Sequence, residues 1–361
     1  MENLIDFSNI RKILVAKLRH HGDVLLTSPL FSQLKKVCPH ATIDAYLYKE
    51  THPMLAGHPA INDFLLYDKS WKKLSLPMRL LQETKLLQRI RKGNYDLVIN
   101  LTEGDRGALA AKVSKARYTV GFDAEGSGMK GKNKCYTHVV RICHKPRHTV
   151  ERHLDVLRCL GISIPENERD IFFHIPQECK TKIATLVPND YTLIHPVSRW
   201  LFKALPTKTI ANLIKELHAQ GKNIVLSSSP DPQELAMCEE ILVQTKEIPI
   251  CNLAGKTSLK ELGALIEQAE LLITVDSLPL HLSSALKTPV VAIFGPTSDE
   301  TWAPWCNPNS RIVTKSMPCR PCYMPGCGGS GRSDCLETLE LSKILNAVKQ
   351  LTSTFSRSSC S

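Results

Sequence analysis

The sequence has no long apolar run in its 361 residues. No stretch approaches the roughly eighteen consecutive apolar residues that a membrane-spanning helix needs. The first residues, MENLIDFSNIRK, include acidic side chains and no apolar core, which is unlike a signal peptide. We therefore expect a cytoplasmic protein without a spanning helix.

Aromatic residues are also scarce, at 6% of the chain. There is no zinc-finger spacing and no aromatic RNA-binding motif, so nucleic acid is a disfavoured partner. The net charge is nevertheless +11, from 46 basic against 35 acidic residues. Such a surplus favours an anionic partner, either a phosphorylated substrate or the surface of an anionic membrane.

Two nucleotide-binding fingerprints are missing. The chain has neither G-x-G-x-x-G after its first strand-like segments nor G-x-x-x-x-G-K-[ST]. The first absence argues against an NAD-dependent oxidoreductase, and the second excludes a P-loop NTPase. We expect no organic cofactor.

Thirteen cysteines are present, but their odd number and the missing export signal argue against a disulfide framework. Four of them follow the spacing C-x2-C-x4-C-x7-C: Cys319, Cys322, Cys327 and Cys335. Four thiolates at short spacing can form a tetrahedral zinc site. Since C-x-x-C occurs only once in this segment, a reduced loop without metal is the favoured interpretation, with zinc as the alternative.

The length predicts two domains, because one hydrophobic core rarely grows this large. Apolar strand-like segments alternate with helical patterns in both halves, which is typical of parallel sheets covered on both faces. We expect strands at 12–18, 42–47, 64–67, 95–100, 118–121, 191–194, 223–227, 271–275, 290–294 and 311–314. We expect helices at 24–37, 74–91, 107–113, 148–160, 206–220, 232–244, 258–268, 278–287 and 339–351.

The glycine- and lysine-rich segment 123–146 interrupts the alternation and is predicted to be a mobile loop. The fold class is therefore α/β, with two Rossmann-like domains that face each other across a cleft. The boundaries we assign are 1–180 for the first domain and 181–351 for the second. Residues 352–361 are predicted to be a disordered tail.

The stretch RHHGDVLLTSP at 19–29 places an acidic residue, Asp23, where the first strand turns into a helix. Three interpretations compete: a phosphate loop, a catalytic base and an ordinary helix cap. Backbone N–H groups at a helix start favour the charged form of a carboxylate, as a general base requires.

Polar residues follow three strands of the second half, where open parallel sheets bind their ligands. Asp276, Ser277 and His281 occupy the start of a helix whose free N–H groups could hold phosphate. The alternative is that Asp276 or Ser277 only caps this helix.

The strand at 191–194 runs into a loop with a hydroxyl and a basic side chain, Ser198 and Lys203, both suited to phosphate. An exposed basic loop is the alternative. After the strand at 223–227, either Asp231 or Glu234 could bind ribose hydroxyls, or both could stabilise a helix N-terminus.

Four segments together resemble a known family. RHHGDVLLTSPLF, HPVSRWLFK, VDSLPLHLSSAL and VVAIFGPT are similar to segments of the ADP-heptose:lipopolysaccharide heptosyltransferases, glycosyltransferase family 9. The resemblance runs from about residue 11 to 345, and HTVERHLDVLRCLG points to the type III branch, which adds a branch heptose to the inner core.

This resemblance implies a GT-B fold and inverting, metal-independent transfer of heptose from ADP-heptose. Asp23 would be the base, Lys203 and Ser198 would hold the diphosphate, and Asp276, Ser277 and His281 match the family's D-T-G-x-x-H motif. Leu278 stands where the family has glycine, which puts a close main-chain contact to phosphate in doubt.

The acceptor would be the phosphorylated lipopolysaccharide inner core, which is held in a membrane. Six basic residues of the first domain are candidates to meet it: Lys72, Lys73, Arg106, Lys130, Lys132 and Arg147. The resemblance thus implies a monomeric enzyme, peripheral on the cytoplasmic face of the inner membrane of a Gram-negative bacterium.

Two alternatives stay open at this point. A nucleotide-sugar epimerase or hydrolase on the same scaffold would turn over its substrate without an acceptor. A basic RNA or membrane binder without enzymatic activity would lose affinity steeply as salt rises.

Overall fold

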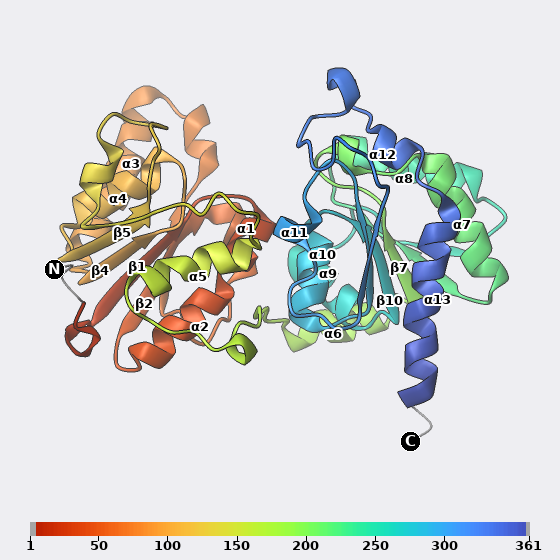
Figure 1. The fold of residues 1–361 in the computed structure, drawn as a ribbon, viewed down its shortest axis with the longest axis horizontal. Coiled ribbons are helices and arrows are strands. Elements are labelled where there is room, and N and C mark those ends of the chain that lie inside the picture. The colour runs from red at the N-terminus through yellow and green to blue at the C-terminus, as the bar shows by residue number, and fades with distance from the viewer. Residues whose placement is uncertain (1–4, 359–361) are drawn as a thin grey trace. The chain divides into compact units, whose positions relative to one another are not determined.

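The computed structural model describes residues 5–358, with side chains to Thr352. The chain divides into two compact units, Met1–His174 and Ile175–Ser361. Each unit holds one six-stranded sheet in which all neighbouring strands are parallel. Helices pack on both faces of each sheet (Figure 1). The predicted α/β class with two Rossmann-like units is confirmed.

The first sheet has the strand order β3-β2-β1-β4-β5-β6. Its strands are β1 (Lys12–Lys17), β2 (Thr42–Tyr48), β3 (Asp63–Tyr67), β4 (Leu97–Asn100), β5 (Tyr118–Phe122) and β6 (His138–Val140). Its α-helices are α1 (His21–Leu25), α2 (Ser28–Val37), α3 (Leu76–Lys92), α4 (Asp105–Ser114) and α5 (Thr149–Cys159). Short 3-10 turns join them, among them η3 (Lys69–Lys73) and η4 (Lys132–Cys135).

Two features of this unit differ from the prediction. The single helix expected at 24–37 is broken into α1 and α2, because Pro29 begins a new helix and the Thr27 hydroxyl donates to the Val24 carbonyl (2.6 Å). The segment 123–146 is not one loop, since it contains η4 and the edge strand β6. Strand β6 has only three residues, too few for an alternating pattern to show in the sequence.

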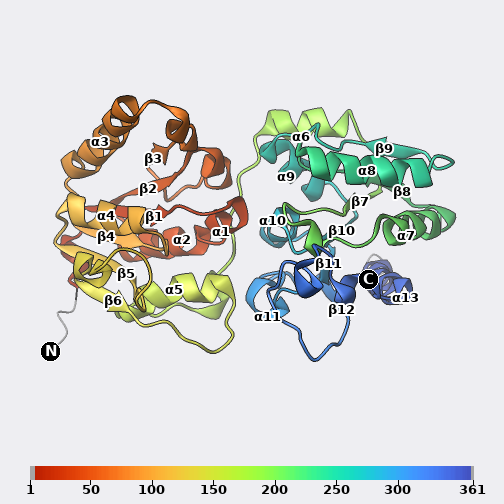
Figure 2. The same cartoon turned by 90° about the horizontal axis from the view of Figure 1, so that it is seen from above.

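The second sheet has the order β12-β11-β10-β7-β8-β9. Its strands are β7 (Tyr191–His195), β8 (Asn223–Leu226), β9 (Ile250–Asn252), β10 (Leu271–Val275), β11 (Val290–Phe294) and β12 (Ser310–Thr314). Its α-helices are α6 (Gln177–Ala184), α7 (Thr207–Ala219), α8 (Pro232–Gln244), α9 (Leu259–Glu267), α10 (Leu278–Leu286), α11 (Asp299–Trp302), α12 (Asp334–Glu337) and α13 (Leu341–Ser358). Every residue of β7, β10 and β11 is buried, which explains their unbroken apolar sequences (Figure 2).

The boundary between the units lies before α6, not at residue 180. Helix α6 packs against α9 of the second unit through the ion pairs Lys182–Glu261 (2.5 Å) and Lys180–Glu267 (2.7 Å). A short polar helix carries no local signal of the sheet it joins, so the sequence could not place this boundary.

The predicted tail also begins as a helix. Helix α13 continues through Thr352 to Ser358. The sequence predicts disorder from residue 352, so this prediction is wrong for 352–358. Residues 359–361 lie outside the described residues. The segment contains neither proline nor glycine, and adding residues to a packed helix is far easier than starting one.

Both sheets reverse their strand order once, between β1 and β4 in the first and between β7 and β10 in the second. In open parallel sheets such switch points leave room for ligands outside the carboxyl ends of the strands. Among residues 5–358, no helix is long and apolar enough to cross a membrane.

Candidate functional site

An ion pair lies at the switch point of the second sheet, at the carboxyl ends of β7 and β10. Lys203 ends the 3-10 turn η6 (Leu201–Lys203) after β7, and Asp276 follows β10. The Lys203 Nζ lies 2.7 Å from Asp276 Oδ2, and the two side chains are 17% and 5% exposed. A largely buried ion pair needs good geometry to offset its desolvation, so both groups are held firmly in place.

The start of α10 lies beside this pair. Ser277 is its N-cap residue, and the Ser277 hydroxyl donates to the Val275 carbonyl (3.3 Å) without capping the helix. Pro279 has no N–H, so this terminus offers fewer donors than an ordinary one. His281, one turn further, is buried with its ring centroid 6.1 Å from that of Trp302.

Ser198 shapes the loop that carries Lys203. Its buried hydroxyl accepts from the Trp200 N–H (3.1 Å) and donates to the Trp200 carbonyl (2.8 Å). The Arg199 guanidinium lies over the Trp200 ring, 5.4 Å from its centroid. In this structure Ser198 thus acts on the turn that leads to Lys203.

Sequence reasoning did not assign a role to His195, although it follows an apolar run. The His195 Nδ1 lies 2.9 Å from the Ser227 Oγ, and the His195 carbonyl accepts from the Thr274 hydroxyl (3.0 Å). These contacts tie together the ends of β7, β8 and β10. Burial lowers the pKa of His195 to about 4, so its imidazole is neutral near pH 7.

The structure separates the two candidate ribose acids. Asp231 is exposed and caps α8, because its carboxylate accepts from the Gln233 N–H (2.9 Å). Glu234 is only 5% exposed, and its Oε2 accepts from the Ser229 N–H (3.0 Å) in the loop that follows β8. Glu234 is therefore fixed beside the carboxyl end of β8, whereas Asp231 caps the helix.

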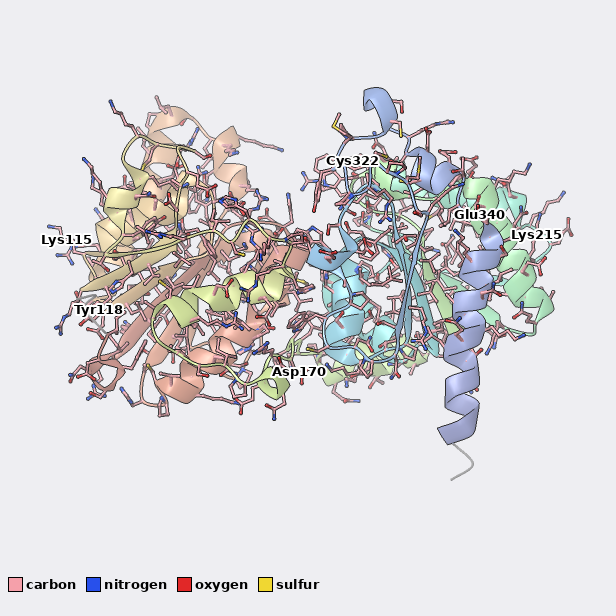
Figure 3. All side chains as sticks on the ribbon, in the orientation of Figure 1. Lys115, Tyr118, Asp170, Lys215, Cys322 and Glu340 are labelled. Carbon is pink, nitrogen blue, oxygen red and sulfur yellow. The ribbon has the colours of Figure 1, made fainter. Side chains whose placement is uncertain are left out.

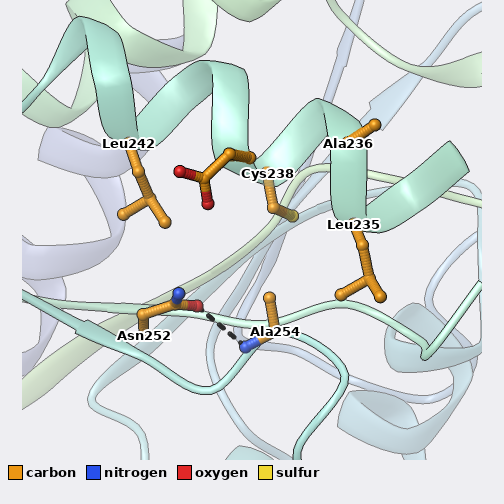
Figure 4. Close-up of a pocket in the computed structure, with 7 residues that line it drawn as sticks. Leu235, Ala236, Cys238, Leu242, Asn252 and Ala254 are labelled. Carbon is orange, nitrogen blue, oxygen red and sulfur yellow. Dashed lines mark hydrogen bonds between the residues drawn. The ribbon is translucent and has the colours of Figure 1, made fainter. Parts of the chain in front are cut away.

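A small open pocket lies elsewhere on the second unit, between α8 and the end of β9 (Figure 4). It is lined mostly by apolar side chains, among them Leu235 and Leu242. Its one amide group, Asn252, is engaged with the Ala254 N–H (3.0 Å). None of the predicted site residues lines this pocket, so it is not the candidate site.

In the first unit, Asp23 lies in the first turn of α1 and is partly buried. Lys17, at the end of β1, is 4% exposed and donates from Nζ to the Leu101 carbonyl (3.0 Å). Burial lowers the pKa of Lys17, and the Asp23 and Glu103 carboxylates oppose that effect. The Asp23 carboxylate thus interacts electrostatically with the buried amino group of Lys17, which lies at the end of β1.

His153 of α5 borders the same region. Its Nδ1 lies 3.1 Å from the Leu26 carbonyl, and burial, with help from the charge on Lys17, holds the pKa of His153 well below its usual range. Neither Lys17 nor His153 was identified from the sequence. A lysine that closes an apolar strand was the available signal for Lys17.

The six basic candidates for the acceptor fall into two groups. Lys72, Lys73 and Lys130 are exposed. The other three are engaged within the unit.

Arg106 donates to the Tyr67 hydroxyl (2.7 Å), and Lys132 is buried with Nζ donating to the Glu103 carbonyl. Arg147 forms ion pairs with Glu151 (3.3 Å) and Asp155 (3.2 Å). These three side chains organise the unit around them.

The four clustered cysteines differ in their surroundings. Cys335 is buried in the core of the second unit, where burial raises the pKa of its thiol. Cys327 Sγ accepts from the Asp334 N–H (3.4 Å), and Cys322 lies in the loop before α12 (Figure 3). Within the described part of the chain, no group of three or more His, Cys, Asp or Glu side chains is arranged as a metal site.

Comparison with known proteins agrees with the resemblance seen in the sequence. A family model described as glycosyltransferase family 9 (heptosyltransferase) matches residues 83–328. Lipopolysaccharide heptosyltransferase 3 of Escherichia coli K12 is 38% identical over 294 residues, which is 80% of this chain and 83% of that protein.

Two solved structures share the fold at lower identity. Heptosyltransferase II of E. coli superposes with a TM-score of 0.76 at 22% identity, over 94% of this chain and 98% of that one. The E. coli heptosyltransferase WaaC with ADP gives a TM-score of 0.70 at 20% identity, over 95% and 99% of the two chains. These likenesses show that the chain has the GT-B fold.

The neutral state of His195 predicts acid sensitivity. Its pKa of about 4 lies below the 6.5 of an unfolded chain, so only the unfolded state takes up this proton between those values. The free energy of unfolding should fall by about 2 to 3 kcal/mol from this residue as pH drops through that window. Urea unfolding of wild type and His195→Gln at about pH 7 and about pH 4.5 measures the difference.

The glutamine variant should show the shallower pH dependence, since the other buried histidines contribute equally to both proteins. The exposed His40, replaced by glutamine, is the matched control. Equal pH slopes for wild type and His195→Gln would contradict this assignment.

Proposed function

The chain belongs to glycosyltransferase family 9, the heptosyltransferases, and we propose that its second unit binds ADP-heptose while its first unit supplies the catalytic base. It is a glycosyltransferase of lipopolysaccharide core synthesis. The observation that carries this conclusion is the 38% identity to a heptosyltransferase 3 across 80% of the chain. A heptose of the inner core is accordingly the proposed acceptor, with transfer of type III.

The Lys203–Asp276 pair supports the donor site. Lys203 offers a compact positive charge at the edge of the sheet, and Asp276 fixes its position. We place the diphosphate of ADP-heptose against Lys203 and Ser277, beside the first turn of α10. Ser198 holds the loop of Lys203, and His281 adds a polar ring one turn along the helix. The structure of the relative WaaC was solved with ADP, which supports the choice of nucleotide.

The transfer step follows from these positions. An acceptor hydroxyl oxygen forms a bond to C1 of the heptose while the bond from C1 to the β-phosphate oxygen breaks. The hydroxyl proton passes to a carboxylate oxygen of Asp23, and ADP leaves with the electron pair of the broken bond. Attack from the side opposite the leaving group inverts the configuration at C1.

Charge on the departing ADP is stabilised by groups of the chain itself. The Lys203 ammonium and the N–H groups at the start of α10 provide fixed positive charge, the kind of preorganised stabilisation that is worth several kcal/mol. We therefore propose a metal-independent reaction. Within the first unit, the Asp23 and Glu103 carboxylates favour the charged form of the buried Lys17 side chain, against the effect of burial.

The acceptor side rests on exposed basic residues. Lys72, Lys73 and Lys130 can reach phosphate groups of the inner core. Arg106 and Arg147 are engaged within the unit, so we assign them a supporting role on the acceptor side. Because the acceptor is anchored in a membrane, we propose that the enzyme works as a monomer at the cytoplasmic membrane surface.

The test of this function is direct transfer. Purified chain, ADP-heptose and inner-core oligosaccharide lacking the branch heptose should give a product heavier by one heptose, together with ADP. Asp23→Ala should lower turnover by about 10²- to 10⁴-fold, the usual contribution of a general base, and leave ADP affinity within about twofold. Glu178→Ala, which removes an acid from the first turn of α6, is the matched control and should keep full activity.

Near-normal turnover by Asp23→Ala would show that Asp23 is not the catalytic base. Release of free heptose at full rate without acceptor would instead identify a hydrolase.

The diphosphate role of Lys203 has its own consequence. Removal of one charge-assisted contact of about 1.5–3 kcal/mol should weaken ADP binding about 10- to 100-fold in Lys203→Ala. Lys208→Ala, an exposed lysine of α7, should bind ADP normally. Titration calorimetry measures both constants, and an unchanged dissociation constant for Lys203→Ala would make the ion pair purely structural.

The choice of Glu234 over Asp231 predicts a difference between two mild variants. Glu234→Gln should weaken ADP binding about tenfold, because a charged acceptor to the ribose hydroxyls is lost. Asp231→Asn should stay within about twofold, since asparagine caps a helix about as well as aspartate. The effect of Glu234→Gln should vanish with 2′,3′-dideoxy-ADP, and a loss that persists with this analogue would rule out ribose recognition.

A further inference from the structure

Five large apolar side chains stand exposed within eight residues at the start of α3. Of twelve exposed large hydrophobic residues among the described side chains, five form this α3 apolar surface: Leu74, Leu76, Met78, Leu80 and Leu81. Leu76 is 66% exposed and Leu80 is 55% exposed. Five exposed large apolar side chains so close together in the chain are unlike the scattered single ones that are normal on a surface, and they indicate an interaction site. We propose that it inserts into the surface of an anionic lipid bilayer.

The exposure follows from how α3 is packed. Only Leu86 and Ile90, both in the second half of the helix, are buried against the sheet. Helix α3 runs along the β3 side of the first unit (Figure 2). The apolar side chains of its first turns therefore leave about half of their surface or more in solvent.

The start of α3 is nevertheless fixed from its inner side. The Tyr67 hydroxyl donates to Glu83 Oε1 (2.9 Å), and Arg79 Nε donates to the same oxygen (3.2 Å). Arg106 stacks on the Tyr67 ring at 4.2 Å, and Trp71 packs against its edge at 5.0 Å. These polar and aromatic contacts hold the start of α3 in place, while its apolar side chains stay exposed.

The charge around the surface selects the partner. Residues 69–92 contain eight basic side chains and one acid, Glu83, which is engaged on the inner face. Lys72 and Lys73 stand exposed directly before the α3 apolar surface, and Lys85 stands exposed after it. Three of the eight basic side chains pair with acids within the unit, Lys69 with Glu50, Arg79 with Glu83 and Arg89 with Asp63. Exposed apolar side chains next to unpaired basic charge are the pattern of a segment that lies in an anionic membrane interface.

This inference rests on the proposed function, which gives the enzyme an acceptor anchored in a bilayer. Docking through α3 would hold the first unit, with Asp23, at the membrane surface. The leucines would enter the acyl boundary while the lysines contact lipid phosphates. It would also explain why Lys72 and Lys73 meet phosphate, whether on lipid or on the inner core.

Vesicle flotation of the full chain tests the proposal without a turnover assay. Wild type should float with vesicles of phosphatidylglycerol and phosphatidylethanolamine, and about tenfold less with pure phosphatidylcholine. The triple variant Leu76→Ser/Leu80→Ser/Leu81→Ser should bind the anionic vesicles about tenfold less than wild type. Raising salt from about 0.1 M to about 1 M should weaken wild-type binding.

The control variant is Leu186→Ser/Val243→Ser, which removes two exposed apolar side chains of the second unit and should float like wild type. Turnover with deacylated, water-soluble acceptor should be unchanged in the triple variant, which separates docking from catalysis. Full vesicle binding by the triple variant, or none by wild type, would overturn the proposal. So would conversion of a dimer to a monomer in the triple variant with no change in flotation, because the surface would then join two copies. Absence of transfer in wild type would refute the proposed function and leave the flotation result intact.

Discussion

A parallel strand buried on both faces can accept charged side chains most easily at its ends, where ligands and partner groups can reach them. In the second unit, β7, β10 and β11 are buried along their whole length. Polar and charged groups therefore collect where the strands stop, and the switch points between β1 and β4 and between β7 and β10 leave the space for them. The Lys203–Asp276 pair and the Lys17–Asp23 neighbourhood both arise from this one constraint.

Burial removes these polar groups from water, and each unit offsets the lost hydration with specific hydrogen-bond or ion-pair partners. Lys203 has Asp276, Lys17 has the Leu101 carbonyl, and His195 has Ser227 and Thr274. Such paired polar groups at a strand edge are already held in position before a ligand arrives. Preorganisation of this kind suits transfer from a nucleotide sugar, because charge on the leaving diphosphate then meets fixed positive groups.

The basic surplus of the chain serves more than one purpose. Arg106 and Arg147 are engaged inside the first unit, where they pin α3 and α5. Lys72 and Lys73 remain exposed beside the apolar start of α3. The basic side chains behind the net charge of +11 thus include some that stabilise the unit and others that can face an anionic surface.

The sequence by itself determined the features that depend on neighbours in the chain. Apolar runs gave the central strands, the capping box gave the start of α9 at Ser258 and Glu261, and the Asp276-to-His281 motif gave the family. The sequence did not predict the short strands β6 and β9, the break between α1 and α2, or the end of α13. The local sequence patterns of these features are brief or ambiguous.

Tertiary structure alone decided what depends on residues far apart in the chain. It placed Lys17 near Asp23, buried Cys335 in the core of the second unit, and separated the buried Glu234 from the capping Asp231. It also left the apolar side chains at the start of α3 exposed, although in the sequence these leucines resemble those of a core helix. Burial is a property of the folded surroundings, and apolar periodicity gives only the face of a helix, not what lies against it.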